Sequence, residues 1–134
     1  MNEAHDYSDL GFDVETHREA LRVFANYGFS EATTRAGLKA RDLVAVRMKS
    51  AKFGFGVTDD LTSVEQGQRA PGCAAFEVIH QCGSGEEAQQ IRADVERYFR
   101  RHFPGRCLDR SAEAAVTEAV GEMYVYIELF EPAG

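Results

Sequence analysis

The sequence has no run that approaches the roughly 18 consecutive apolar residues of a membrane-spanning helix. Its N-terminal stretch, MNEAHDYSDLGFD, is acidic, whereas a secretory signal opens with basic residues. We therefore expect a cytoplasmic protein with no membrane partner.

Cysteine is scarce, because the three residues are odd in number and form no C-x-x-C pair. Neither a disulfide framework nor a zinc ribbon is indicated, and Cys73, Cys82 and Cys107 are expected to be buried or idle. His80 and Cys82 would point two soft ligands to one side of a strand, with Cys107 or His102 completing a metal site. That spacing matches no recognised ligand set, so we expect a buried histidine beside an inert cysteine, and no cofactor.

Two motifs of catalysis and phosphate binding are also missing. No G-x-S-x-G nucleophile elbow is present. The stretch KFGFGVTDDL, residues 52–61, carries two glycines, but a phosphate-binding loop needs further glycines and a lysine at the helix start. Asp59 and Asp60 stand there instead and would repel an anion. We interpret the glycines as allowing close backbone approach within a strand.

Basic residues are outnumbered, 15 Lys and Arg against 22 Asp and Glu, which gives a net charge of −7. This deficit disfavours a general nucleic-acid binder. Six arginines nevertheless fall within residues 92–110, against three acidic residues. They could solvate a helix end and offset its dipole, or they could bind an anion. The candidate anion or nucleic-acid ligands are Lys52, Arg97, Arg100, Arg101 and Arg106.

The composition, with 44% apolar and 28% charged residues, is that of an ordinary globular protein. We expect one domain over residues 1–134, with an acidic arm and N-terminal helices over 1–40 and an α+β core over 41–134. Predicted helices cover 14–27, 30–37, 58–68, 84–103 and 111–121, and predicted strands cover 43–49, 52–57, 74–82 and 123–130. The first two strands are expected to form a hairpin, within a small mixed or antiparallel sheet packed against the long helix and the shorter helices.

The long helix has the clearest signals. Ser84 and Glu87 form a capping box, and Pro104 ends the helix. Its apolar face comprises Ala88, Ile91, Val95, Phe99 and Phe103.

The last strand alternates strictly, with Met123, Val125, Ile127 and Leu129 on one side. Its other side carries aromatic residues. Such a strand is either central in a sheet covered on both faces or places one face against a partner. Homodimerisation or a protein partner is therefore expected through the interface candidates Tyr124, Tyr126 and Phe130.

The order of these elements resembles the GIY-YIG nuclease superfamily, particularly its phage-type branch. The resemblance spans about residues 42–103, and its matching residues are Gly56-Val57-Thr58, Asp60-Leu61, Glu96, Arg100 and Phe103. In that family, a tyrosine from each hairpin strand, an arginine and a glutamate surround one divalent metal and the scissile phosphate.

Carried onto this chain, the family pattern loses most of its chemistry. The first tyrosine falls within Val44-Ala45-Val46, the second at Gly54 or Phe53, and the arginine at Ser63 or Val64. Only Glu96 is retained, and an i, i+4 ion pair with Arg100 accounts for it as well as a metal does.

The sequence therefore predicts a small, non-catalytic binding or regulatory domain with a degenerate GIY-YIG-like fold. Its expected ligand is a nucleic acid, another anion or a protein partner. One alternative is a Mg²⁺- or Mn²⁺-dependent endonuclease with a rearranged site built on Glu96. The other is an oligomeric regulatory module with no nucleic-acid role.

Overall fold

The computed structural model describes residues 18–47, 52–63, 73, 75–108 and 120–130. Its helical segments are α1 (Arg18–Asn26), α2 (Glu31–Asp42), the π-helical turn η3 (Leu43–Arg47), α3 (Leu61–Ser63) and α4 (Gly85–His102). Its strands are β1 (Lys52–Thr58), β2 (Ala75–Ser84) and β3 (Val120–Phe130). The predicted α+β class is confirmed. Within the described ranges, no helix combines the length and the apolar character needed to cross a bilayer.

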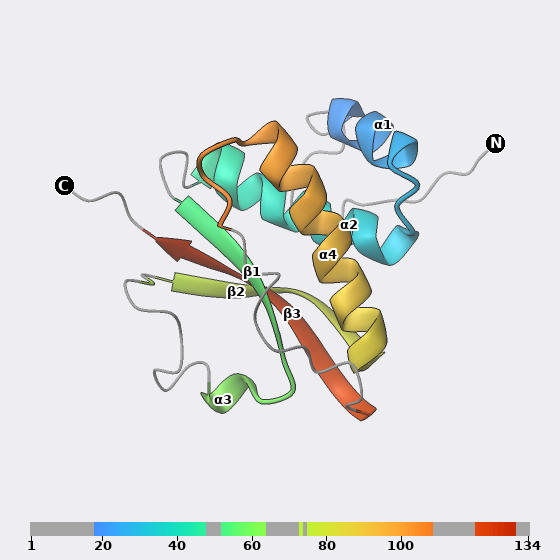
Figure 1. The fold of residues 1–134 in the computed structure, drawn as a ribbon, viewed down its shortest axis with the longest axis vertical. Helices are drawn as coiled ribbons and strands as arrows, with labels where there is room; N and C mark the ends of the chain where they lie inside the picture. The colour runs from blue at the N-terminus through green and yellow to red at the C-terminus, as the bar shows by residue number, and fades with distance from the viewer. Residues whose placement is uncertain (1–17, 48–51, 64–72, 74, 109–119, 131–134) are drawn as a thin grey trace.

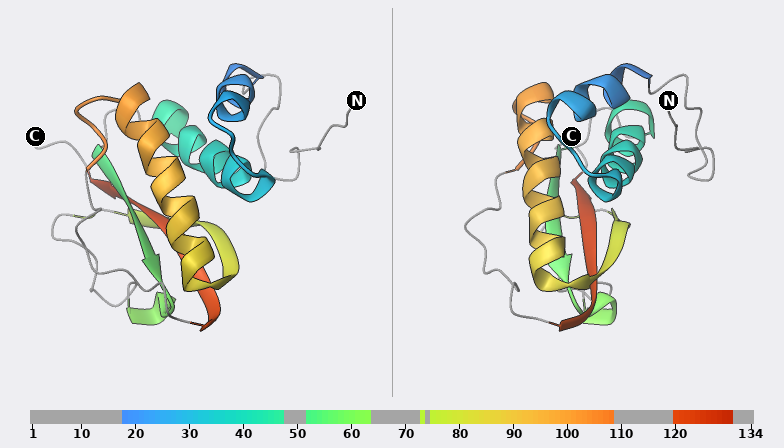
Figure 2. Two further views of the ribbon diagram at one scale, coloured as in Figure 1. Left: turned by 45° about the vertical axis from the view of Figure 1, so that its right-hand side comes forward. Right: turned by 90° about the vertical axis from the view of Figure 1, so that its right-hand side faces the viewer.

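The sheet is antiparallel throughout and has the order β1-β3-β2. The C-terminal strand β3 therefore lies in the centre and pairs with both other strands. Helix α4 runs across the sheet and contacts all three strands, while α2 contacts β2 and α4. Figure 1 shows α4 in front of the strands, with α1 and α2 beside its C-terminal half, and the two views in Figure 2 agree.

The predicted hairpin is wrong, because Leu43–Arg47 is helical and β1 pairs with β3 instead. The segment continues α2, and its buried residues Leu43 and Val44 extend the buried stripe of Ala36 and Ala40. A β-branched composition predicts a strand only weakly when helical spacing places the same residues in a core.

The predicted stop at Gly37 is also wrong, since α2 runs on to Asp42. A methyl group at position 37 would lie 3.0 Å from Cζ of Phe24, so this glycine allows α1 to pack closely on α2. Helix α1, in contrast, is followed by Gly28. Its φ of 77° is typical of a glycine that ends a helix. Ser30 caps the start of α2, because its Oγ accepts a hydrogen bond from the Thr33 N–H at 3.1 Å.

Helix α4 matches its prediction closely. Ser84 Oγ accepts a hydrogen bond from the Glu87 N–H at 3.1 Å, and the helix ends at His102, with Phe103 as its C-cap. Ala88, Ile91, Val95 and Phe99 are buried, and Phe103 is partly buried against the core. Phe99 meets Phe53, Phe55, Tyr98 and Phe103 with ring centroids 4.8–5.7 Å apart.

Strand β3 shows the predicted alternation, because Met123, Val125, Ile127 and Leu129 are buried. Phe53 and Phe55 are their neighbours on β1 and contact α4, so this side of the sheet faces the helices. Tyr126 and Glu128, on the opposite side, are also buried. Of the two predicted arrangements, a central strand covered on both faces is the one observed at these positions.

Gly56 of KFGFGVT allows close approach within the sheet, as predicted for the glycines of this stretch. Gly56 lies opposite Tyr126 in the register of β1 and β3. A methyl group at position 56 would lie 2.5 Å from both Cζ and the hydroxyl oxygen of Tyr126. The tyrosine ring therefore occupies the space above Gly56, and any larger residue there must displace it.

Strand β2 is irregular, because a bulge lies between Val78 and His80. Ile79 falls within this bulge and is buried. The Val78 carbonyl accepts a hydrogen bond from Lys39 Nζ at 3.1 Å, which ties this edge strand to α2. A bulge and a covering lysine both protect a sheet edge from further pairing.

Several predictions fall outside the described residues. They are the acidic arm, most of the helix predicted over 58–68, of which Leu61–Ser63 is helical, and most of the helix predicted over 111–121. The end of this last prediction is wrong, because Val120 and Gly121 belong to β3.

Candidate anion-binding site

The charges of α4 are divided between its two ends. Glu86 and Glu87 lie in the first turn, and Arg100, Arg101 and His102 lie in the last. This order complements the helix dipole. It also leaves the C-terminal half of the helix basic. The end of α1 packs against this half, with the ring centroids of Phe24 and Tyr98 4.8 Å apart.

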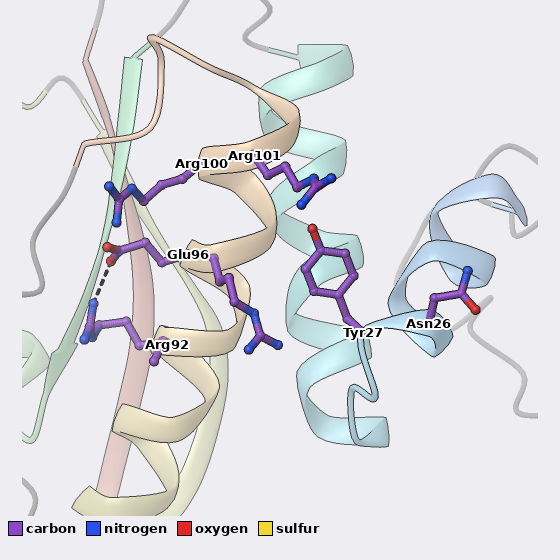
Figure 3. Close-up of a pocket in the computed structure, with 8 residues that line it drawn as sticks. Asn26, Tyr27, Arg92, Glu96, Arg100 and Arg101 are labelled. Carbon is purple, nitrogen blue, oxygen red and sulfur yellow. Dashed lines mark hydrogen bonds and ion pairs between the residues drawn. The ribbon is translucent and has the colours of Figure 1, made fainter.

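A depression of about 860 Å³ opens on this basic surface. Its walls come from α4 and from the end of α1 with the following turn, and its lining residues are Asn26, Tyr27, Arg92, Ala93, Glu96, Arg97, Arg100 and Arg101. Figure 3 shows Arg92, Glu96 and Arg100 extending on the side of α4 that faces β1, whereas Arg101 extends toward Tyr27. The structure thus brings Arg97, Arg100 and Arg101, three of the predicted anion ligands, into one site.

Glu96 is buried within this surface and forms an ion pair with Arg92 at 2.6 Å. The side chains are only 13% exposed for Arg92 and 5% for Glu96, so both charges are largely withdrawn from water. The i, i+4 ion pair predicted for Glu96 was with Arg100, whereas the pair at 2.6 Å is with Arg92, on the preceding turn. Separating such a pair is costly, because each charge would be left buried without a partner. Both side chains are therefore held in place.

Arg97 and Arg101 are exposed, and neither side chain is held by a short ion pair within the described part of the chain. Arg97 lies 3.8 Å from Asp94, with 59% of its side chain exposed, and its guanidinium sits 5.3 Å from the centre of the Tyr27 ring. Within the part of the chain that the structure describes, the Arg101 guanidinium has no hydrogen-bond or ion-pair partner. Both side chains are therefore available to an incoming anion.

The other two predicted anion ligands lie elsewhere. Arg106 is partly buried, donates a hydrogen bond to the Val44 carbonyl at 2.9 Å, and stacks over Phe53 and Phe103. It links η3 to the core. Lys52 is exposed at the start of β1, opposite Phe130, and does not line the depression.

His80 and Cys82 lie on β2 and are partly buried. Burial lowers the pKa of His80 below its usual value, against an opposing effect of Glu87, and the cations Arg35 and Lys39 lower it further. Burial also raises the pKa of the Cys82 thiol, which donates a hydrogen bond to the Ser84 carbonyl at 3.5 Å. A thiol that holds its proton is a poor nucleophile and a poor metal ligand. Among the residues described, no three His, Cys, Asp or Glu side chains gather as a metal site would require.

The lowered pKa of His80 predicts that the folded state loses stability as the pH falls. The unfolded chain takes up this proton at about pH 6.5, whereas the folded chain takes it up only at a lower pH. The free energy of unfolding should therefore decrease from pH 7.5 to pH 5.5, and it should decrease less in His80→Gln. Urea titrations at several pH values measure both slopes, and equal slopes would contradict the prediction.

The three interface candidates do not share one environment. Tyr126 is 9% exposed and packs on Phe76 with ring centroids 6.0 Å apart. Tyr124 and Phe130 are partly buried, and the Tyr124 hydroxyl donates a hydrogen bond to Glu122 at 2.8 Å. Homodimerisation through this strand stays a prediction.

Sequence reasoning missed four lining residues of the site, Asn26, Tyr27, Arg92 and Ala93. Arg92 could have been predicted, because it lies four residues before Glu96 on a helix with clear apolar periodicity. Tyr27 gave no such signal, since it joins the site only through the packing of α1 against α4, 75 positions from its partner His102.

Comparison of the chain with protein-family models, with curated proteins and with solved structures gave no match. The relationship to GIY-YIG nucleases therefore stays a prediction.

Proposed function

We propose that this chain is a non-catalytic binding domain that takes an anionic ligand in the depression on α4. The observation that carries the proposal is the gathering of Arg97, Arg100 and Arg101 around one concave surface. Guanidinium groups donate paired hydrogen bonds to phosphate and carboxylate oxygens, and such charge-assisted bonds are stronger than neutral ones.

The local charge favours this assignment despite the acidic total of −7. Screening limits the reach of charges to about 8 Å at physiological ionic strength, so an anion in the depression responds mainly to its immediate neighbours. The carboxylate of the lining residue Glu96 is paired with Arg92 at 2.6 Å, which reduces its repulsion of an anion.

The pairing of Glu96 also favours binding over hydrolysis. A nuclease metal would need this carboxylate as a ligand. In the structure it accepts a hydrogen bond from Arg92 and is buried.

Isothermal titration with inorganic triphosphate tests the binding proposal. We expect binding at 50 mM NaCl that weakens several-fold at 200 mM NaCl, because the interaction is screened by salt. The double variant Arg97→Gln, Arg101→Gln should bind at least about tenfold more weakly, since each lost charge-assisted bond contributes more than about 1 kcal/mol.

The matched control removes two arginines from α1 instead. Arg18→Gln, Arg22→Gln changes the net charge equally at exposed positions that do not line the depression. It should leave triphosphate affinity within about twofold, because neither side chain lines the depression and Arg22 is already ion-paired with Glu19 at 2.9 Å. Absence of binding by the unchanged chain, or an equal loss in both double variants, would overturn the proposal.

The nuclease alternative has its own test. Plasmid nicking that requires Mg²⁺ or Mn²⁺ and disappears in Glu96→Gln would show that the chain is catalytic, whatever the triphosphate titration gives.

A further inference from the structure

Tyr27 is a rigid aromatic wall of the depression. It occupies the turn between α1 and Gly28, and its backbone N–H donates hydrogen bonds to the carbonyls of Val23 and Phe24. Three aromatic neighbours then fix its ring. The centroids of Phe29, Tyr98 and His102 lie 5.5, 5.8 and 6.1 Å away, each at an interplanar angle of 55–75°.

The hydroxyl of Tyr27 is held as well, because it lies 3.3 Å from Nε2 of His102. His102 is itself stacked on Tyr98, with centroids 4.4 Å apart and an interplanar angle of 24°. The ring of Tyr27 therefore has a fixed position between α1 and α4, and Figure 3 shows it facing the site beside Arg101.

Arginines adjoin this fixed ring. The Arg97 guanidinium lies over one face of the ring, 5.3 Å from its centre. Arg101 extends from the next turn of α4 toward the same residue. A fixed aromatic ring with a guanidinium plane offers a stacking surface for a nucleobase, and neighbouring arginines neutralise the phosphates attached to it. Free phosphate or an acidic peptide would use the arginines alone.

We infer that the ligand of this site is a nucleotide, with its phosphates on Arg97 and Arg101 and its base stacked against Tyr27. This inference rests on the proposed anion-binding function and adds the chemical class of the ligand. A free nucleotide and a single-stranded oligonucleotide share this chemistry.

Comparison of ADP with inorganic pyrophosphate isolates the contribution of the base, because both carry a diphosphate. Titration calorimetry of the unchanged chain should give an affinity for ADP about tenfold higher than for pyrophosphate, as expected for one stacked base. Tyr27→Leu should bring the two affinities within about twofold of each other, whereas Tyr27→Phe should preserve the difference.

The outcomes separate this inference from the proposed function. Equal affinities for ADP and pyrophosphate in the unchanged chain would overturn the nucleotide inference and leave the anion site standing. Failure of both to bind would overturn both. An ADP preference that persists in folded Tyr27→Leu would overturn the role of Tyr27, and a melting curve of each variant establishes that it is folded.

Two further titrations identify the source of the nucleotide. Oligo-dT of ten nucleotides binding more tightly than ADP, with the same loss in Tyr27→Leu, would identify a single strand as the ligand. Polyglutamate binding as tightly as ADP would overturn the inference in favour of an acidic protein partner.

Discussion

Phe99→Ala is expected to lower the free energy of unfolding by about 4 kcal/mol, the range found for truncating a large aromatic residue in a core. Phe99 is fully buried and contacts four aromatic rings contributed by α4, β1 and the residue after α4. Its removal would leave a cavity between the helix and the sheet. Because a domain of this size has a total stability of roughly 5–15 kcal/mol, the loss is a large share of it.

Urea titration followed by circular dichroism measures the effect of Phe99→Ala, and Leu108→Ala is its control. Leu108 is 39% exposed, so truncating its side chain should cost less than about 1 kcal/mol. A loss below about 1.5 kcal/mol in Phe99→Ala would show that the helix and sheet do not depend on this contact.

Gly56→Ala is expected to destabilise the chain by about 2 kcal/mol, although alanine is ordinarily tolerated in a strand. The added methyl group would overlap the Tyr126 ring, which is 9% exposed and has little room to move. The measurement is again the free energy of unfolding from urea titration.

A double-mutant cycle shows whether this cost arises from the tyrosine. In a Tyr126→Leu background the alanine should cost at least about 1 kcal/mol less, because the overlapping ring is gone. Gly83→Ala is the matched control, since a methyl group at position 83 of β2 meets nothing within 4 Å. Equal costs of Gly56→Ala in both backgrounds would refute the proposed overlap.

Local signals in the sequence were sufficient for α4 and β3. The capping box at Ser84 and the apolar spacing of α4 are properties of neighbouring residues, and the alternation of β3 is too. The pairing of the strands could not be predicted from local signals, because strand register and strand order depend on contacts between segments that are distant in sequence. Leu43–Arg47 shows the same limit, since its β-branched residues favour a strand locally and the core places them in a helix.

The candidate site could be predicted from the sequence only in part, for a similar reason. Arg97, Arg100 and Arg101 follow from helical spacing along one element. Arg106 has the same residue type and lies nearby in sequence, yet it is directed into the core to hold the Val44 carbonyl. Only the chain reversal after α4 distinguishes it from its neighbours, and that reversal involves the positive φ of Gly105, 81°, and a parallel bridge between Phe53 and Cys107.

The central position of β3 has a consequence for synthesis of the chain. Strands β1 and β2 do not pair with each other, and both pair with the strand that the ribosome makes last of the three. Until residues 120–130 emerge, the inner edges of β1 and β2 lack their partner and the apolar face of α4 lacks the middle of its sheet. The sheet can therefore close only after β3 has been released, so this chain must form its core late and in contacts of long sequence separation, which slows folding.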